Sequence, residues 1–450
     1  MYKLSEIPQE YKKRLITADE AAAKIQDGDR VSYGLGLSTP ADIDQAIGRI
    51  ANKLHNVEIV YTTLVVDKPY GAWTKDATNE NIRFASAHMN GIDRKMNKDG
   101  RLWFIPMLFN ELPYYWADTG IDKLIIQVHP MDQYGNFNLG PQCSDLRGLL
   151  SCAKMVIVEE NEKMPRALGY QTELNISDVD FVVKGSNTPM PEIPNKAATP
   201  EDEKIADFVV SKIKNGSTLQ LGIGGLPSAI GKKLAESDIQ DLSGHTEMLV
   251  DSYVDLFEAG KITGNKSLDK GKIVYTFAGG TKRLYDFIDN NQIVFSAPVN
   301  YVNNVGVVQQ IDNFVSINGC VNLDLFGQVN SESAGFTPIS GTGGQLDFAL
   351  GAYLSKGGQG FICLHSCRKL KDGSLESNIM PTLTKGSIVT TPRSAVHNIV
   401  TEYGIAKLKG RSTWQRAEAL INIAHPDFRD DLIKEAEKMG IWTKTSKITG

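Results

Sequence analysis

The sequence has few cysteines, no long apolar run and no excess of basic charge. Its 450 residues include five scattered cysteines, an odd number that argues against a disulfide framework and for a reducing compartment. No segment approaches about 18 apolar residues and the N-terminus lacks an apolar signal core, so neither a membrane span nor a signal peptide is expected. The net charge of −5, with both signs interspersed, argues against a nucleic-acid surface, which requires a basic stripe. We therefore expect a cytoplasmic protein with no nucleic-acid or membrane partner.

Several motifs of catalysis and metal binding are also missing. There is no Gly-x-Ser-x-Gly nucleophile elbow with suitable partners, no zinc-protease motif and no Walker loop. Cys363, His365 and Cys367 are spaced like metal ligands but lack a second ligand pair, and residues 361–364 are typical of a buried strand. We expect no metal site and no tightly bound cofactor.

The length and one proline-rich stretch predict two domains. A chain of 450 residues is too long for one ordinary core. Residues 185–200 contain four prolines, which prevent a continuous helix or a central strand, so this stretch is interpreted as a linker. The expected domains are residues 1–190 and 191–450.

A repeated pattern indicates that the two domains are related. An Ile, a Gly, an aliphatic residue and two further glycines recur at a constant offset of 188 residues, as Ile25, Gly28, Val31, Gly34 and Gly36 and then as Ile213, Gly216, Leu219, Gly222 and Gly224. Each copy predicts a helix, a tight turn, a short strand, a Gly-x-Gly turn and a helix with proline near its start. This pattern predicts an internal duplication of an α/β domain.

The remaining periodicity fits two α/β domains with mainly parallel sheets. Near-continuous β-branched and apolar runs at residues 57–66, 123–128 and 155–158 predict buried parallel strands. Helices are expected over 41–53 and 227–236, and two more over 413–439, interrupted at His425-Pro426.

A glutamate inside an apolar, strand-like run is one candidate for chemistry. Glu247 lies in the run from His245 to Val250, and buried glutamates are uncommon unless they are paired or reactive. His245 would point to the same face of an extended strand. The pattern alone leaves open whether Glu247 is structural or a nucleophile, and it favours a structural role for His245.

Two glycine-rich segments could bind anionic groups. Residues 222–227 stand where a strand gives way to a helix, so their amides could approach a phosphate or could form only a tight turn. Residues 340–348 contain three glycines in four positions, which exposes successive amides, as at an oxyanion site. A flexible turn is the alternative reading of that segment.

Taken in order, these segments resemble the acetyl-CoA hydrolase/transferase family of class I CoA-transferases across nearly the whole chain. The resemblance rests on six blocks, and within the family it is strongest to butyryl-CoA:acetate CoA-transferases and then to 4-hydroxybutyrate CoA-transferases. The blocks are residues 221–227, 245–248, 327–332, 340–348, 400–404 and 423–428.

The resemblance implies a function and roles for named residues. It implies that Glu247 is the nucleophile, that the Gly344 amide holds the thioester oxyanion, and that Lys371, or Lys369 if the alignment shifts, lies near the CoA phosphates. It also implies that a loop contacts coenzyme A, the co-substrate, through Gly224, Gly225, Leu226, Pro227 and Ser228. The partners would be acyl-CoA and short carboxylic acids, in a homodimer or higher homo-oligomer.

Three alternatives to transfer between a short-chain acyl-CoA and acetate stay open. One is an acetyl-CoA hydrolase with the same intermediate, because water access to it depends on closure of the site. A second is 4-hydroxybutyrate CoA transfer. The third is a non-catalytic CoA-binding or sugar-phosphate-sensing domain on the same kind of scaffold, since a fold does not fix a function.

Overall fold

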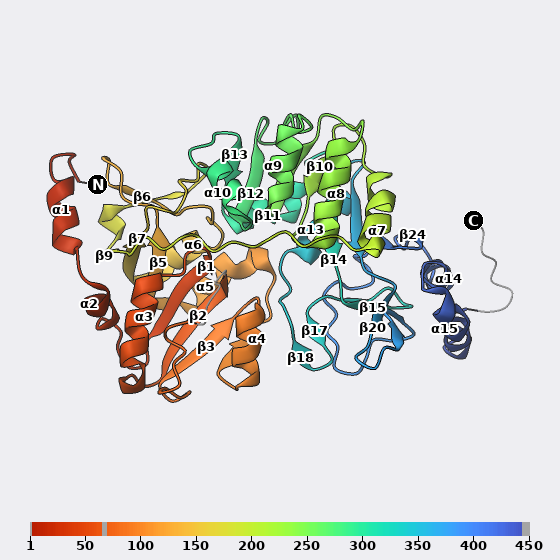
Figure 1. Ribbon diagram of the computed structural model, residues 1–450, viewed down its shortest axis with the longest axis horizontal. Helices are drawn as coiled ribbons and strands as arrows, with labels where there is room; N and C mark the ends of the chain where they lie inside the picture. The colour runs from red at the N-terminus through yellow and green to blue at the C-terminus, as the bar shows by residue number, and fades with distance from the viewer. Residues whose placement is uncertain (1, 65–69, 443–450) are drawn as a thin grey trace. The chain divides into compact units, whose positions relative to one another are not determined.

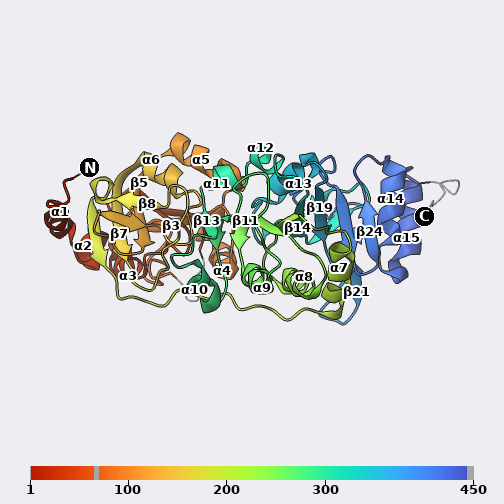
Figure 2. The same cartoon turned by 90° about the horizontal axis from the view of Figure 1, so that it is seen from above.

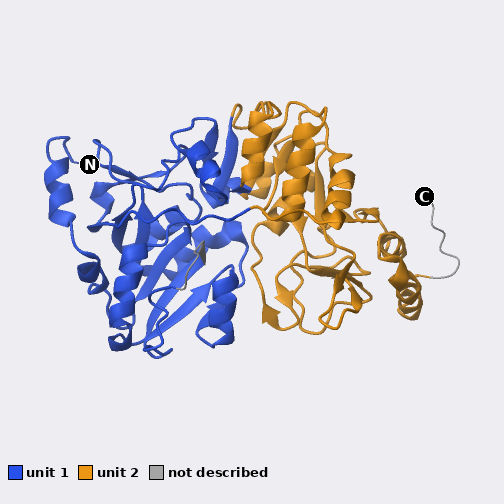
Figure 3. Cartoon of the chain, viewed as in Figure 1, with its two compact units in different colours: residues 1–194, 247–249, 272–302 blue, residues 195–246, 250–271, 303–450 orange. Residues whose placement is uncertain are grey.

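The computed structural model describes residues 2–64 and 70–442 and divides into two compact units (Figure 3). Unit 1 comprises residues 1–194, 247–249 and 272–302, and unit 2 comprises 195–246, 250–271 and 303–450. The last three residues of a single strand, Glu247–Leu249, therefore belong to unit 1, whereas the earlier part of that strand belongs to unit 2.

A seven-stranded sheet forms the centre of unit 1, with the order β4-β3-β2-β1-β5-β7-β9. Every neighbouring pair in it is parallel. Its strands are β1 Arg30–Gly36, β2 Val57–Leu64, β3 Ile82–Ser86, β4 Leu102–Phe104, β5 Ile121–Val128, β7 Ala153–Glu160 and β9 Phe181–Lys184. Unit 1 also contains the parallel pair β12 Ile273–Ala278 and β13 Val294–Ser296.

Helices cover both faces of this sheet because successive strand residues point to opposite sides. Ile125 belongs to the core under α2 Ala18–Ala22, α3 Ala41–Ile50 and α4 Gly91–Lys98. Leu124 and Ile126 belong to the opposite core, under α5 Leu112–Thr119 and α6 Leu146–Cys152. This explains why the strands are near-continuously apolar in sequence.

Unit 2 repeats the strand order of unit 1. The order β2-β1-β5-β7-β9 of the first unit has its counterpart in β11-β10-β14-β19-β23 of the second, and α8 follows β10 as α3 follows β1. The strands are β10 Thr218–Gln220, β11 Ser243–Leu249, β14 Phe314–Gly319, β19 Gln359–Cys363 and β23 Asn398–Thr401, with β24 Gly404–Lys407 added antiparallel at the edge. The duplicated α/β plan with mainly parallel sheets is confirmed.

Three helices of unit 2 lie side by side along the sheet, as Figure 1 shows: α7 Pro200–Val210, α8 Gly225–Glu236 and α9 Asp251–Glu258. Beyond β24 come α14 Thr413–Asn422 and α15 Pro426–Lys438, which pack against each other (Figure 2). The predicted interruption at His425-Pro426 is confirmed, since His425 caps α15 and Pro426 is its first residue.

Other sequence predictions differ from the structure mainly at element ends. Helix α8 begins at Gly225, two residues before the predicted Pro227, and the predicted helix 41–53 is α3 followed by a 3₁₀ turn, Ala51–Lys53. Strand β2 ends at Leu64, and the last two residues of the predicted strand 57–66 lie outside the described residues. Residues 185–199 form neither helix nor strand, as their prolines predict.

The remaining elements are short or peripheral. The helices are α1 Ile7–Arg14, α10 Lys282–Ile288, α11 Val299–Val302, α12 Val305–Val308 and α13 Gln345–Leu354, with 3₁₀ turns at Phe109–Glu111 and Ile176–Asp178. The strands are β6 Asn136–Asn138, β8 Glu173–Asn175, β15 Asn322–Asp324, β16 Val329–Asn330, β17 Ser333–Ala334, β18 Thr337–Pro338, β20 Cys367–Lys369, β21 Leu375–Ser377 and β22 Ile379–Met380. Within residues 2–64 and 70–442, no helix is long and apolar enough to cross a membrane.

Candidate functional site

The loop between β10 and α8 is fixed by hydrogen bonds to its first residue. The Tyr253 hydroxyl accepts a hydrogen bond from the Leu221 amide at 3.1 Å and donates one to the Leu219 carbonyl at 3.0 Å. The Thr246 hydroxyl donates to the Leu221 carbonyl at 3.1 Å. Because all these groups are buried, the bonds hold the start of the glycine loop in one place, next to β11.

Two glycines of this loop occupy positions that disfavour a side chain. Gly224 has φ +120° and ψ −178°, a combination that side chains rarely adopt. A Cβ on Gly225 would lie 2.8 Å from Asp202 Oδ2 and 3.1 Å from the Ala197 carbonyl oxygen. The loop can therefore pass close to α7, and it leads directly into the first turn of α8.

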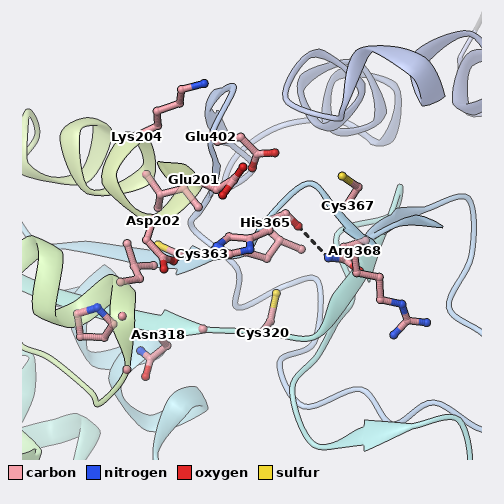
Figure 4. A pocket seen from close by; sticks show the side chains of 18 of the residues that line it. Glu201, Asp202, Lys204, Asn318, Cys320, Cys363, His365, Cys367, Arg368 and Glu402 are labelled. Carbon is pink, nitrogen blue, oxygen red and sulfur yellow. Dashed lines mark hydrogen bonds and ion pairs between the residues drawn. The ribbon is translucent and has the colours of Figure 1, made fainter. Parts of the chain in front are cut away.

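The N-terminal end of α8 opens into a cavity of about 940 Å³ within unit 2. The carboxyl ends of β14 and β19, the start of α7 and strand β20 also line it (Figure 4). Its lining includes Gly222, Ile223, Gly224, Gly225, Leu226, Pro227, Gly319, Cys363, His365 and Lys369. A cavity of this size accommodates a drug-sized or coenzyme-sized group.

Charged groups of both signs line the cavity. Asp202 accepts a hydrogen bond from the Thr199 amide at 3.0 Å and lies 2.9 Å from His365 Nε2. Burial raises the pKa of Asp202, but these bonds outweigh it, so the net pKa is lowered. Lys204, Arg368 and Lys369 add positive charge, whereas Glu201 and Glu402 add negative charge. Figure 4 shows the Asp202 and His365 side chains next to each other in the cavity lining.

Three thiols, those of Cys320, Cys363 and Cys367, also line the cavity. Burial raises the pKa of the Cys363 thiol to about 12, so it stays protonated and is a poor nucleophile near neutral pH. Among the described residues, no group of three or more His, Cys, Asp or Glu side chains could hold a metal ion.

Glu247 is the fifth residue of β11 and its side chain is half-buried. It directly follows Thr246, the residue that anchors the glycine loop. His245 is fully buried, and its ring packs edge-on against Phe314 with centroids 6.0 Å apart. This packing supports the structural role expected for His245.

The second glycine-rich segment also ends in a helix. Gly344 is the N-cap of α13, and Gly343 before it has φ +56°, so the chain turns sharply there. The Ser340 hydroxyl donates to the Ser331 carbonyl at 3.0 Å, and Gln345 Nε2 donates to Thr391 Oγ1 at 3.2 Å. The amides at the start of α13 are thus presented by a turn tied to neighbouring segments.

Beside this turn lies the buried carboxyl group of Glu332, for which the sequence indicates no role. Glu332 is 5% exposed, and burial raises its pKa, while the hydroxyls of Thr342 and Thr390 lower it. The sequence offered a weak signal for it, namely its place in the block 327–332, but no reason to expect its burial.

The structure gathers only part of the predicted set around the cavity. Four of the five predicted loop residues line it, and so does Lys369. Ser228 lies within α8, and Lys371 is exposed at the turn between β20 and β21; neither is among the residues lining this cavity. Glu247 and Gly344 lie in other segments, in units 1 and 2 respectively.

Comparison with known proteins covers both halves of the chain. Residues 2–194 match the acetyl-CoA hydrolase/transferase N-terminal domain, and residues 280–436 match the C-terminal domain of the same name. The butyryl-CoA:acetate CoA-transferase of Anaerostipes caccae is 48% identical, covering 98% of this chain and 99% of its own. The 4-hydroxybutyrate coenzyme A transferase of Clostridium kluyveri is 40% identical, covering 95% and 98%.

Solved structures of related proteins are also similar to this chain over nearly its full length. RipA from Yersinia pestis superimposes with a TM-score of 0.87 at 34% identity, covering 97% of this chain and all of RipA. The 4-hydroxybutyrate CoA-transferase of Porphyromonas gingivalis superimposes with a TM-score of 0.78 at 31% identity, covering 96% and 99%. The duplicated fold, the two domain matches and these full-length similarities agree: the chain belongs to the acetyl-CoA hydrolase/transferase family.

Proposed function

We propose that this protein moves coenzyme A between a short-chain acyl-CoA, such as butyryl-CoA or propionyl-CoA, and acetate. The observation that carries the proposal is the 48% identity, over nearly the full length of both chains, to a protein named butyryl-CoA:acetate CoA-transferase. The cavity at the start of α8 supports it, since glycine amides and a helix N-terminus there face a space of coenzyme size.

Glu247 is the proposed nucleophile. Its carboxylate attacks the acyl carbonyl of acyl-CoA, the carbon–sulfur bond breaks, and an acyl-glutamyl anhydride and the CoA thiolate form. The thiolate then attacks the glutamyl carbonyl, and the first carboxylic acid leaves as its anion, which gives a glutamyl-CoA thioester. Acetate reverses these steps and departs as acetyl-CoA.

A carboxylate suits this task better than a hydroxyl. An anhydride is as activated as a thioester, so the energy of the thioester bond is retained for the second acid, whereas a serine would form a stable ester. Because the enzyme is modified between the two substrates, the mechanism predicts ping-pong kinetics.

The other predicted residues bind coenzyme A or stabilise the oxyanion. The Gly344 amide would donate to the oxyanion that develops on the thioester carbonyl, where loss of one donor costs about 3 kcal/mol. The loop from Gly224 to Ser228 would contact CoA. Of the two candidate lysines, Lys369 is supported by its place in the cavity lining, which makes it a better candidate than Lys371 for the phosphates.

Chemical trapping tests the covalent step. The enzyme is incubated with butyryl-CoA without acetate, treated with borohydride, digested and analysed by mass spectrometry. A glutamyl thioester is reduced to an alcohol, so we expect the modification at Glu247 and none in the Glu247→Gln variant. Modification of another residue, or turnover without any modification, contradicts the proposal.

The same enzyme preparation separates transfer from hydrolysis. We expect acetate to accelerate the loss of butyryl-CoA strongly and acetyl-CoA to appear in equal amount. Fast release of CoA that acetate does not change would identify a hydrolase. A catalytically inert CoA-binding protein would show binding that Glu247→Gln leaves unchanged and no turnover at all.

A further inference from the structure

In unit 1, the carboxylate of Glu159 binds the N-terminus of α3, the helix that follows the first strand of the repeat. Glu159 Oε2 accepts hydrogen bonds from the amides of Asp42 and Ile43, in the first turn of α3, at 3.0 and 2.9 Å. Glu159 Oε1 accepts one from Gln127 Nε2 at 3.1 Å. Glu159 is 1% exposed, so an anion-binding helix end is filled from within the fold.

Strand register identifies the equivalent positions in unit 2. Val31 pairs with Lys123, which pairs with Met155. In the second repeat, the residue equivalent to Val31 is Leu219, which pairs with Val315, which pairs with Gln359.

Four residues further along the strands, on the same face, the two repeats differ. Unit 1 has the pair Gln127 and Glu159, which are neighbours in register. The positions equivalent to these are Gly319 and Cys363 in unit 2, and they are neighbours as well. A long amide and a carboxylate in one repeat are thus replaced by a hydrogen atom and a short thiol in the other.

The two small residues line the cavity at the start of α8. Gly319 and Cys363 share that lining with the loop from Gly222 to Pro227. Asp202, whose carboxylate also lines this cavity, is already bonded to the Thr199 amide and to His365. The space that a carboxylate side chain fills in unit 1 therefore remains open in unit 2.

We propose that the side chain at position 363 determines whether the second repeat accepts coenzyme A. A carboxylate there closes the space beside the loop from Gly222 to Pro227, and a short uncharged side chain opens that space to an anionic group of coenzyme A. This inference rests on the proposed function, since it assumes that coenzyme A occupies this cavity. In unit 1 the helix that follows the equivalent strand, α3, begins after Pro40, and its first-turn amides are bound internally by Glu159. In this inference the second repeat is therefore the one available to the ligand.

The test introduces the unit 1 side chain into unit 2. Cys363→Glu is compared with Cys363→Gln, which has the same size without the charge, and with Cys363→Ser. Binding of coenzyme A is measured by calorimetry, and thermal unfolding without ligand checks the fold. We expect Cys363→Ser to bind like the wild type, and Cys363→Glu to bind at least tenfold more weakly than Cys363→Gln.

A double variant keeps the test decisive if Cys363→Glu does not fold. Gly319→Gln with Cys363→Glu rebuilds the complete pair of unit 1, and a Cβ on Gly319 meets nothing closer than 3.9 Å. The double variant should fold and should also lose affinity for coenzyme A.

Equal affinity of the Glu and Gln variants, or wild-type affinity of Cys363→Glu, overturns the inference. The proposed function fails separately, by absence of acyl transfer in the wild-type enzyme, whatever these variants show.

Discussion

The carboxylate that fills the first repeat predicts a specific pH dependence of stability. Burial raises the pKa of Glu159 to about 7 from 4.5, although the amides of α3 and the Gln127 side chain lower it in part. The folded state therefore holds this proton more tightly than the unfolded state. Its contribution to stability is complete below about pH 4.5 and is lost as the pH rises through about 7.

The size of this effect follows from the shift. A difference of about 2.5 pKa units corresponds to roughly 3 kcal/mol at full titration, of which most falls between pH 5 and pH 8. Glu159→Gln keeps a side-chain oxygen that can accept from the α3 amides but does not ionise. Asp44, whose pKa burial raises to about 6, titrates in both proteins and cancels in the comparison.

Urea unfolding at closely spaced pH values measures the difference. The free energy of unfolding of the wild type should fall relative to that of Glu159→Gln by about 2–3 kcal/mol between pH 5 and pH 8. Hydrogen exchange of a peptide covering α3 should show the same trend, which locates the effect. A difference between the two proteins that does not change with pH would refute the assignment of Glu159 as a buried carboxyl group bound to α3.

Three further substitutions test whether the loop between β10 and α8 and the cavity beside it bind coenzyme A. Gly225→Ala places a Cβ 2.8 Å from the Asp202 carboxylate oxygen and 3.1 Å from the Ala197 carbonyl oxygen, so the loop or its neighbours must shift. We expect a rise in KM for butyryl-CoA of tenfold or more with little change in melting temperature. An unchanged KM would contradict the assigned contact. Thr246→Val removes the hydroxyl that donates to the Leu221 carbonyl. The loss should lower the free energy of unfolding in urea by about 1 kcal/mol and weaken the binding of coenzyme A measured by calorimetry. Wild-type affinity would show that this bond does not position the loop. Lys369→Ala should raise the KM for butyryl-CoA several-fold, and more at low salt. Lys371→Ala serves as the matched surface control. A larger rise in KM for Lys371→Ala than for Lys369→Ala would favour Lys371 as the phosphate contact.

Much of the fold was predictable because the signals for it are local. The buried strands at 123–128 and 155–158 and the helices at the C-terminal end follow from residues close in sequence. The repeat was visible because the glycines at its turns need positive φ, as at Gly28 and Gly216. The start of α8 was misplaced because Gly224 and Gly225 fit a turn as well as a helix N-terminus.

The parts that could not be predicted depend on contacts between distant segments. Nothing local marks Glu159 as the cap of α3, which lies more than a hundred residues earlier, nor Cys363 as its counterpart. The pairing of Asp202 with His365 spans a similar separation. Packing of helices against strand ends and loops, together with strand register, brings these residues together. The sequence could therefore indicate a glycine-rich loop without showing what keeps the space beside it open.

Oxygen transfer from the acid substrate tests the central role of Glu247 most directly. In the proposed mechanism, the bridging oxygen of the acetyl-glutamyl anhydride comes from acetate and stays on the glutamate when the CoA thiolate removes the acetyl group. Turnover of butyryl-CoA with ¹⁸O-labelled acetate in ordinary water should therefore place ¹⁸O in the Glu247 side chain and then in released butyrate, as read by mass spectrometry. Butyrate whose new oxygen comes only from water, with no label in the peptide that contains Glu247, would contradict the account.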